Sequence, residues 1–245
     1  MLFSIITATK NAATEIKATL LSVADQKNVE CEHIIIDSVS TDETIHIVET
    51  FVTNHSITIL SEPDVGIADA FNKGISSSTG DWLIFMGAGD TFVDNLVLCD
   101  YQANLATRQD ALVVWGNIIL TSADMLTQKH VSGSFKKNAL KRYMCMPHQA
   151  TFHNRELFKR YGLYSLQYKI AMDYDLILRC FSNISTCDYV DRDVSYMLTG
   201  GISQKYSSHA VSEYRDIQID HKINPKYIAY GWYYWAKLKQ FIKSF

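Results

Sequence analysis

The sequence predicts an α/β fold, in which a mostly parallel sheet carries helices on both faces. Apolar runs with strand character alternate with segments whose apolar residues recur at three- and four-residue steps. Each strand is therefore joined to the next by a helix, as in parallel sheets with right-handed crossovers. Residues 82–86 are continuously apolar, which is typical of a strand covered on both faces. The other early strands are expected at residues 2–9, 33–37 and 57–60.

Three helices are expected between these strands. The first covers residues 11–26, where apolar residues recur at helical spacing. The second follows a capping box, in which Ser40 is the N-cap and Glu43 lies three positions further on. The third covers residues 66–78 and has one apolar face.

After residue 90 the alternation of strands and helices becomes less regular. Gly162 follows a short helical pattern, in the position where glycine commonly ends a helix. The elements expected here are a strand over 111–120, a loop or hairpin over 121–134, a helix over 155–161, a helix over 171–179, a strand over 194–198 and a flexible turn over 199–203.

Composition excludes several classes of protein. A net charge of -3 gives no support for nucleic-acid binding. The five cysteines have no paired spacing, which argues against a zinc site or a disulfide framework and fits a reducing compartment. The first nine residues lack a basic region and a cleavage site, and no apolar run reaches the length of a membrane-spanning helix.

Polar side chains gather where the expected strands end. In open α/β sheets ligands bind at the carboxyl ends of the strands. Hydroxyls and acids at these ends suit a nucleoside held by hydrogen bonds and a diphosphate held through a metal. A dinucleotide-binding glycine motif and a phosphate-binding loop are both missing after the first strand. The side chains concerned are Thr9, Asp37, Ser38, Asp42, Asp64 and Asp90.

Asp90 is the candidate metal ligand. It follows the strand over 82–86 and a bend formed by Gly87 and Gly89, where a ligand can approach the backbone closely. A carboxylate in this position is a hard oxygen ligand suited to Mg²⁺ or Mn²⁺. The alternative is that Asp90 only caps the segment that begins at Thr91.

Two acids stand near the start of the helix over 171–179. Both suit the positive end of the helix dipole. Asp173 and Asp175 cannot both face the same way, because residues two apart leave a helix on different sides. We therefore expect one to face the binding cleft and the other to hold the backbone or a basic group such as Arg179.

The chain ends in a basic amphipathic segment. Residues 222–245 contain five lysines and no acid. This pattern, with tryptophans on the apolar face, is typical of a helix at an anionic membrane surface. The alternative is a terminal helix packed on its own domain or on a partner chain. The apolar residues at three- and four-residue steps are Ile228, Trp232, Trp235, Leu238, Ile242 and Phe245.

The order and spacing of these motifs resemble the family 2 glycosyltransferases with the GT-A fold. Within that family, the chain is most similar to short bacterial enzymes of surface-polysaccharide assembly, of the O-antigen and colanic-acid type. The resemblance implies a Rossmann-like, mostly parallel sheet with helices on both faces and, here, a helical tail. The stretches that carry the resemblance are 4–11, 34–42, 61–74, 80–90, 148–152, 173–176 and 200–203.

The resemblance implies a role for each matching position. Asp90 would bind Mn²⁺ or Mg²⁺, and Asp173 would be the general base that takes the proton of the acceptor hydroxyl. His148 would be a metal or acceptor contact, or a structural histidine. The implied nucleotide-sugar contacts are Thr9, Asn11, Asp37, Ser38, Asp64, Asp69, Asn72 and Lys73. The implied acceptor-side or structural residues are His148, Gln149, Asp175, Gly200 and Gly201.

The implied activity is inverting transfer of a sugar from a nucleotide-sugar donor, with uridine as the favoured base. The acceptor would be a lipid-linked saccharide of the polyprenyl diphosphate type. The enzyme would be cytoplasmic and peripheral at the inner face of the cell membrane. Residues 1–220 would form the GT-A domain, with a nucleotide-sugar half over 1–90 and an acceptor half over 91–220, and residues 221–245 would form the tail.

The chain departs from the family pattern at two places, after the strand over 82–86 and after the strand over 33–37. Gly87, Ala88 and Gly89 stand where members often carry a second acid, and this is the only support for a subunit that binds nucleotide-sugar without catalysis. The presence of both Asp90 and Asp173 speaks against that alternative. Asp37 and Ser38 stand where many members have two acids, which weakens any inference about the base. A nucleotidyltransferase shares the sheet architecture, but it usually has a glycine- and basic-rich loop after the first strand, and residues 9–13 have neither.

Overall fold

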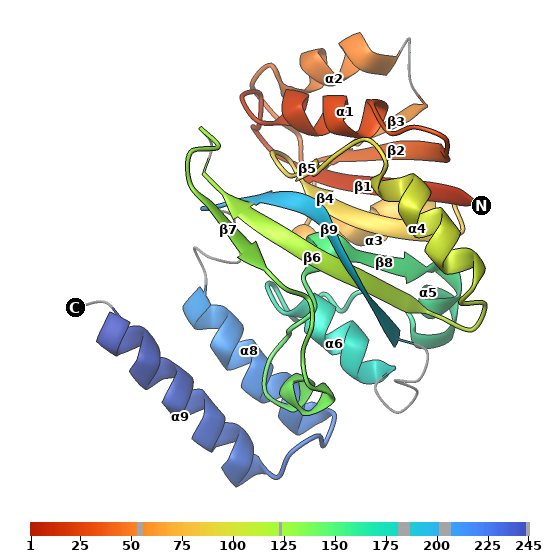
Figure 1. The fold of residues 1–245 in the computed structure, drawn as a ribbon. Coiled ribbons are helices and arrows are strands. Elements are labelled where there is room, and N and C mark those ends of the chain that lie inside the picture. The colour runs from red at the N-terminus through yellow and green to blue at the C-terminus, as the bar shows by residue number, and fades with distance from the viewer. Residues whose placement is uncertain (53–55, 123, 181–186, 201–206, 244–245) are drawn as a thin grey trace.

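The computed structural model describes residues 1–52, 56–122, 124–180, 187–200 and 207–243. Within these residues nine strands form one sheet in the order β3-β2-β1-β4-β8-β6-β9-β5, and β7 pairs with β6 (Figure 1). The strands are β1 Leu2–Thr9, β2 Glu30–Asp37, β3 Ile57–Ser61, β4 Trp82–Gly87, β5 Thr91–Phe92, β6 Val113–Thr121, β7 Gln128–Val131, β8 Thr151–Asn154 and β9 Cys187–Leu198.

Helices connect and cover these strands. Two short 3-10 helices, η1 and η2, lie between β7 and β8. The elements are α1 Ile16–Ala24, α2 Thr44–Val52, α3 Ile67–Ser77, α4 Val97–Ala106, η1 Lys137–Lys141, η2 His148–Ala150, α5 Arg155–Tyr161, α6 Met172–Arg179, α8 Ser207–Asp220 and α9 Lys226–Lys243.

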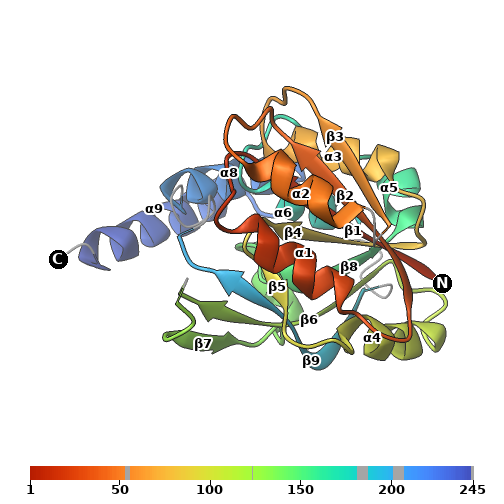
Figure 2. The ribbon, with the colours of Figure 1, turned by 90° about the horizontal axis from the view of Figure 1, so that it is seen from above.

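The parallel half of the sheet is confirmed. β1 pairs in parallel with both β2 and β4, and β2 pairs in parallel with β3. Side chains of β2 alternate between two apolar cores, because Ile34 and Ile36 contact the α3 side while Ile35 contacts α1 and α2. The sheet is therefore buried on both faces, as the continuous apolar runs predicted. Figure 2 shows α1 and α2 on one face and α3 on the other.

Two details of the first helices differ from the prediction. The first helix begins at Ile16 and not at residue 11, because Asn11 has a positive φ of 48° and the chain turns there. The capping box at Ser40 is wrong, because α2 begins at Thr44 and the Thr44 N–H donates to the Asp42 carboxylate at 3.0 Å. The Ser40 hydroxyl accepts from Asn11 N–H instead, at 2.7 Å.

The second half of the sheet is mixed. β8 runs antiparallel to β4 and β6, β9 runs parallel to β6, and β5 pairs antiparallel with β9. The polar segment after β6 forms the hairpin with β7, one of the two outcomes expected for it. α5 ends at Tyr161, and its C-cap residue is Gly162 as predicted, with a positive φ of 80° that glycine adopts without a steric cost.

The C-terminal helices lie at the edge of the molecule, with α9 on the outside of α8 (Figures 1 and 2). No helix among the described residues is both long enough and apolar enough to span a membrane. The predicted apolar face of α9 is split: Trp232 packs inward beneath the Arg142 guanidinium, 4.0 Å from the ring centre, while Trp235 and Leu238 are exposed. Phe245 lies outside the described residues.

Candidate active site

The carboxyl ends of the parallel strands meet at one edge of the sheet, where many of the candidate ligand contacts lie. In the strand register Thr9 pairs with Asp37, and Asp37 pairs with Ser61. The neighbouring end of β4 brings Gly87 to the same edge, where its N–H donates to the Asp90 carboxylate at 2.9 Å. Thr9, Asp37 and Asp90 are therefore gathered from three separate strand ends.

The Thr9 side chain has the clearest signature of a ligand contact. It is only 6% exposed, and its hydroxyl has no hydrogen-bond partner among the described residues. A buried hydroxyl without a partner costs free energy, so such groups are usually satisfied by protein, water or ligand. Ser38 lies beside it, and the Ser38 N–H donates to the Thr9 carbonyl oxygen at 2.9 Å.

Asp37 is fully buried, and protein donors already occupy both of its carboxylate oxygens. Oδ2 accepts from the Ser40 N–H at 2.9 Å and from the Ser61 hydroxyl at 2.7 Å. Oδ1 accepts from the Ser40 hydroxyl. Asp37 thus fixes the loop after β2 against the end of β3, a network that the sequence analysis missed.

Asn11 ties the loop after β1 to the loop after β2. Its positive φ suits asparagine, which tolerates the left-handed region better than most residues. Its side-chain oxygen accepts from the Thr41 N–H at 2.8 Å. The two loops that follow adjacent strands therefore form one rigid wall at the sheet edge.

A second group of predicted contacts surrounds the start of α3. The Asp64 carboxylate accepts from the Gly66 N–H at 2.9 Å, and the Asp69 carboxylate accepts from the Val65 N–H at 3.1 Å. Lys73 forms ion pairs with Glu62 at 2.9 Å and with Asp69 at 3.5 Å. These contacts hold the turn before α3, and they leave Lys73 as a cation flanked by two acids.

Asn72 has a different position from the rest of that group. Its side-chain nitrogen donates to the Tyr164 carbonyl oxygen, and its side-chain oxygen accepts from the Tyr164 N–H, both at 2.9 Å. Asn72 therefore joins α3 to the loop that precedes α6, which sequence spacing did not indicate.

Asp90 lies at the junction of three elements. It is 5% exposed, and its second carboxylate oxygen accepts from the Leu198 N–H at the end of β9 at 3.0 Å. Thr91 begins a strand, so Asp90 does not cap a helix. Gly89 has a φ of 99°, and a Cβ atom there would approach the Leu198 side chain to 2.8 Å. The bend therefore requires glycine at 89 to let β9 reach Asp90.

The charge state of Asp90 is set by its surroundings. Burial raises the pKa of Asp90 to about 6, although the N–H donors of Leu198 and Gly87 act against this rise. The Gln149 side chain also hydrogen-bonds this carboxylate and lowers its pKa. Gln149, which the resemblance placed on the acceptor side, thus contacts the candidate metal ligand.

A divalent metal fits Asp90 as a site completed by substrate. Within the described residues no three histidine, cysteine or acidic side chains gather as a metal cage. Mg²⁺ is commonly held by one or two carboxylates together with substrate phosphates. Besides the Gln149 contact, each Asp90 oxygen accepts one backbone N–H bond, and a carboxylate has about four lone-pair sites, which leaves room for a cation.

Asp173, the candidate base, lies in the first turn of α6. It is half-buried, and its Oδ1 accepts from the Tyr174 N–H at 2.7 Å. Burial, with a smaller contribution from the negative charge of Glu213, raises the pKa of Asp173 to about 7. A carboxylate with a pKa near the working pH is suited to general-base chemistry.

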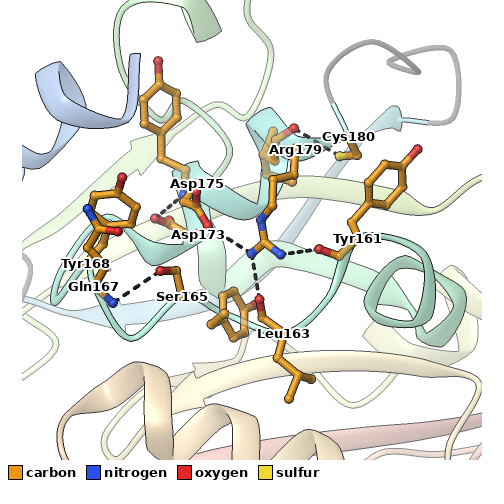
Figure 3. Close-up of polar contacts among 12 residues, drawn as sticks. Tyr161, Leu163, Ser165, Gln167, Tyr168, Asp173, Asp175, Arg179 and Cys180 are labelled. Carbon is orange, nitrogen blue, oxygen red and sulfur yellow. Dashed lines mark hydrogen bonds and ion pairs between the residues drawn. The ribbon is translucent and has the colours of Figure 1, made fainter. Parts of the chain in front are cut away.

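Asp175 has the structural role expected for one of the two acids. It is 5% exposed, forms an ion pair with Arg179 at 3.0 Å and is hydrogen-bonded to His221 Nε2 at 2.8 Å. Figure 3 shows Arg179 between Asp175 and the carbonyl oxygens of Tyr161 and Leu163. Asp175 therefore anchors α6, whereas Asp173 pairs with no cation among the described residues.

His148 lies within an aromatic cluster. Its ring stacks on Phe85 with a centroid distance of 5.3 Å, and its Nε2 lies 3.0 Å from the Tyr164 hydroxyl. Burial lowers the pKa of His148 to about 4. The ring is therefore neutral at physiological pH, and the structural interpretation of His148 fits this environment.

The last two predicted positions follow β9. Gly200 has a φ of 93° and is exposed. Gly201 lies outside the described residues, as does most of the predicted turn over 199–203.

The fold and this edge together define an α/β protein with a polar, carboxylate-bearing edge at the ends of its parallel strands, where a ligand site is expected. Residues 4–173 match the model of glycosyl transferase family 2. The chain belongs to this family. It is 37% identical over 186 residues to a PGL/p-HBAD biosynthesis glycosyltransferase of Mycobacterium bovis, covering 74% of this chain and 70% of the relative.

Solved structures share the fold. S. aureus TarS 1-349 in complex with UDP superposes with a TM-score of 0.71 at 16% identity, covering 94% of this chain and 68% of that one. A mannosyltransferase of Pyrobaculum calidifontis in complex with GDP-Man and Mn²⁺ gives 0.65 at 17% identity, covering 89% and 64%. The chain thus spans just under two thirds of the mannosyltransferase. The GT-A architecture expected from the sequence is confirmed.

Proposed function

We propose that this family 2 glycosyltransferase moves a sugar, with inversion, from a nucleotide-sugar to an acceptor hydroxyl. The observation that carries the proposal is the presence of two carboxylates, Asp90 and Asp173, in different surroundings. Asp90 lies at the same sheet edge as Thr9, whose hydroxyl has no hydrogen-bond partner among the described residues. Asp173 lies at the start of α6 with its pKa raised to about 7.

The reaction is a single displacement. The acceptor oxygen forms a bond to the anomeric carbon while the bond from that carbon to the diphosphate oxygen breaks. The electron pair of the broken bond leaves with the nucleoside diphosphate, and the acceptor proton passes to a carboxylate oxygen of Asp173. A divalent metal, when bound at Asp90, supplies positive charge beside the diphosphate.

The donor site is formed by the sheet edge. Thr9, Asn11 and Ser38 line the nucleoside side in this proposal, and Asp37 fixes the loop after β2 that carries Ser38. The turn before α3, with Asp64 and the Asp69–Lys73 ion pair at 3.5 Å, approaches the ribose and diphosphate. Both polar groups of Asn72 are engaged by Tyr164, so we assign it to positioning the loop before α6.

Uridine is the base we propose, in agreement with the UDP complex of TarS. The mannosyltransferase complex with GDP-Man makes guanosine the natural competitor. A thermal-shift screen of uridine, guanosine and thymidine diphosphates, each with and without Mn²⁺, tests the proposal. We expect the largest rise in melting temperature with uridine diphosphate and Mn²⁺, and a larger rise with another nucleotide would overturn the choice of base.

The acceptor we propose is a lipid-linked saccharide of the polyprenyl diphosphate type, used in assembly of a cell-surface glycoconjugate. Support comes from the relative named for PGL/p-HBAD biosynthesis and from the C-terminal helix. We retain residues 1–220 as the catalytic domain, with halves over 1–90 and 91–220, and residues 221–245 as the tail. The His221 side chain bonds Asp175, so the first residue of the tail is anchored to the domain.

The tail has the surface of a membrane-docking helix. Its outer side exposes large apolar and aromatic side chains, and its lysines have no acid among them. Beside it a groove is lined by Lys141, Arg142 and Trp232, so that cations lie next to interfacial aromatics. Anionic lipids attract such cations while aromatics enter the headgroup layer. The exposed side chains are Tyr227, Tyr230, Tyr234, Trp235, Leu238, Phe241 and Ile242.

Substituting the exposed face should abolish membrane binding. We expect the parent to sediment with phosphatidylglycerol vesicles and the double variant Leu238→Ser, Ile242→Ser to stay largely in solution, because less apolar area enters the bilayer. Leu126→Ser and Leu166→Ser are the matched controls, since both leucines are exposed on the domain. If the parent itself stays in solution, the tail is a packing helix.

A further inference from the structure

Glu213 of α8 reaches across to the turn that leads into α6. Its Oε1 accepts from the Lys169 N–H at 2.9 Å. Its Oε2 accepts from the Ile170 N–H at 2.9 Å and from the Ala171 N–H at 2.8 Å. Three consecutive backbone donors therefore converge on one carboxylate that comes from more than 40 residues further along the chain.

The contact holds the residues that lead directly into α6. Ala171 is the N-cap residue of α6, and alanine has no side-chain acceptor for the free N–H groups of a helix start. Of the three N–H groups that donate to Glu213, that of Ala171 belongs to the helix start, and the Glu213 negative charge lies near the positive end of the helix dipole. Asp173 stands two residues after Ala171, so the turn that Glu213 holds also fixes the backbone of the candidate base.

Glu213 also acts on Asp173 through its charge. Its negative charge adds to burial in raising the pKa of Asp173 to about 7. Two phenols among the described residues also lie near Asp173, Tyr214 from α8 and Tyr164 from the loop before α6, and the Asp173 charge raises the pKa of both. On α6 itself Asp175 forms an ion pair with Arg179 and a hydrogen bond with His221.

We propose that Glu213 is the positioning residue of the general base, holding the turn over 169–171 and presenting one negative charge to Asp173. The inference rests on the proposed role of Asp173. Repulsion from Glu213 raises the pKa of Asp173 and so makes its carboxylate a stronger base. The same shift means that Asp173 becomes protonated, and inactive as a base, at a higher pH. Removing the charge should therefore lower the rate and move the acid limb of the pH–rate profile to lower pH.

The test compares the pH dependence of kcat in Glu213→Gln, Glu213→Asp and the parent. Glu213→Gln loses the charge and places an amide against backbone donors, so we expect kcat to fall by on the order of 10- to 100-fold and the acid limb to shift downward. Glu213→Asp keeps the charge but is shorter by one methylene, so kcat should fall while the acid limb stays in place. The donor KM should change little in both variants.

Three outcomes would overturn the proposal. The first is an acid limb that does not move in Glu213→Gln, since a purely structural role lowers the rate without changing the limb. The second is a parental kcat in either variant. The third, which applies if Glu213→Gln fails to fold, is an acid limb that moves in Glu213→Asp. Glu49→Gln is the matched control, because Glu49 is exposed on α2.

The proposed function and this inference fail in different ways. If Asp173→Asn transfers sugar at the parental rate, the base assignment itself is wrong. If Asp173→Asn is inactive while Glu213→Gln keeps the parental acid limb, only the role of Glu213 is wrong.

Discussion

Asp173→Asn should lower sugar transfer by on the order of 100- to 10,000-fold, the usual cost of removing a general base. An amide cannot accept the proton of the acceptor hydroxyl at a useful rate. Because the pKa of Asp173 is raised to about 7, the parental rate should fall as the pH decreases through that value, where the carboxylate becomes protonated. The measurement is the transfer rate with any accepted donor and acceptor pair.

Nucleotide affinity distinguishes a lost base from a damaged fold. Asp173 lies on α6 and does not belong to the strand ends that form the proposed nucleotide site. Asp173→Asn should therefore bind nucleoside diphosphate as the parent does. Asp175→Asn is the matched variant on the same helix. It breaks the ion pair with Arg179 and alters the hydrogen bond with His221, so we expect a lower melting temperature and no specific loss of kcat. Transfer by Asp173→Asn within about threefold of the parent would exclude the base assignment.

Asp90→Asn should remove the dependence of nucleotide affinity on metal. We expect Mn²⁺ to tighten binding of the nucleoside diphosphate to the parent at least about tenfold, equivalent to about 1.4 kcal/mol. The reason is that an anionic carboxylate and a diphosphate share the cation, whereas a neutral amide contributes much less. Calorimetric titration with Mn²⁺ and with chelator, in both proteins, measures the effect.

The control for Asp90 comes from the other end of the same strand. Asp81 precedes β4 and accepts a backbone N–H from Leu2 at 2.9 Å, much as Asp90 accepts from Gly87 after the strand. Asp81→Asn should therefore keep the full metal effect. Equal affinities for the parent and Asp90→Asn, with and without metal, would remove Asp90 from the metal site.

The sequence predicted the elements whose cause is local. The strand over 2–9 and the helix over 155–161 have the predicted bounds, because apolar periodicity and a terminal glycine act within a few residues. Thr9, Asp37 and Asp90 could be placed at one edge because parallel strands bring their carboxyl ends together.

What the sequence did not predict are partnerships between distant segments. Three hydrogen-bonded contacts join parts of the chain that no local pattern relates. They are those of Ser61 with Asp37, of Leu198 with Asp90, and of Glu213 with the turn before α6. The same limit applies to α9, where spacing put Trp232 and Trp235 on one apolar face. In the structure Arg142 covers Trp232, whereas Trp235 is exposed. Tertiary packing determines this difference, and the spacing of the residues does not reveal it.

The anomeric configuration of the product tests the central claim most directly. A single displacement assisted by one base, Asp173, must invert the configuration of the donor sugar. Transfer from an α-linked uridine diphosphate sugar, followed by proton NMR of the new linkage, should show a β-glycoside. An α-glycoside would contradict the mechanism, even if Asp173 proved essential for the rate.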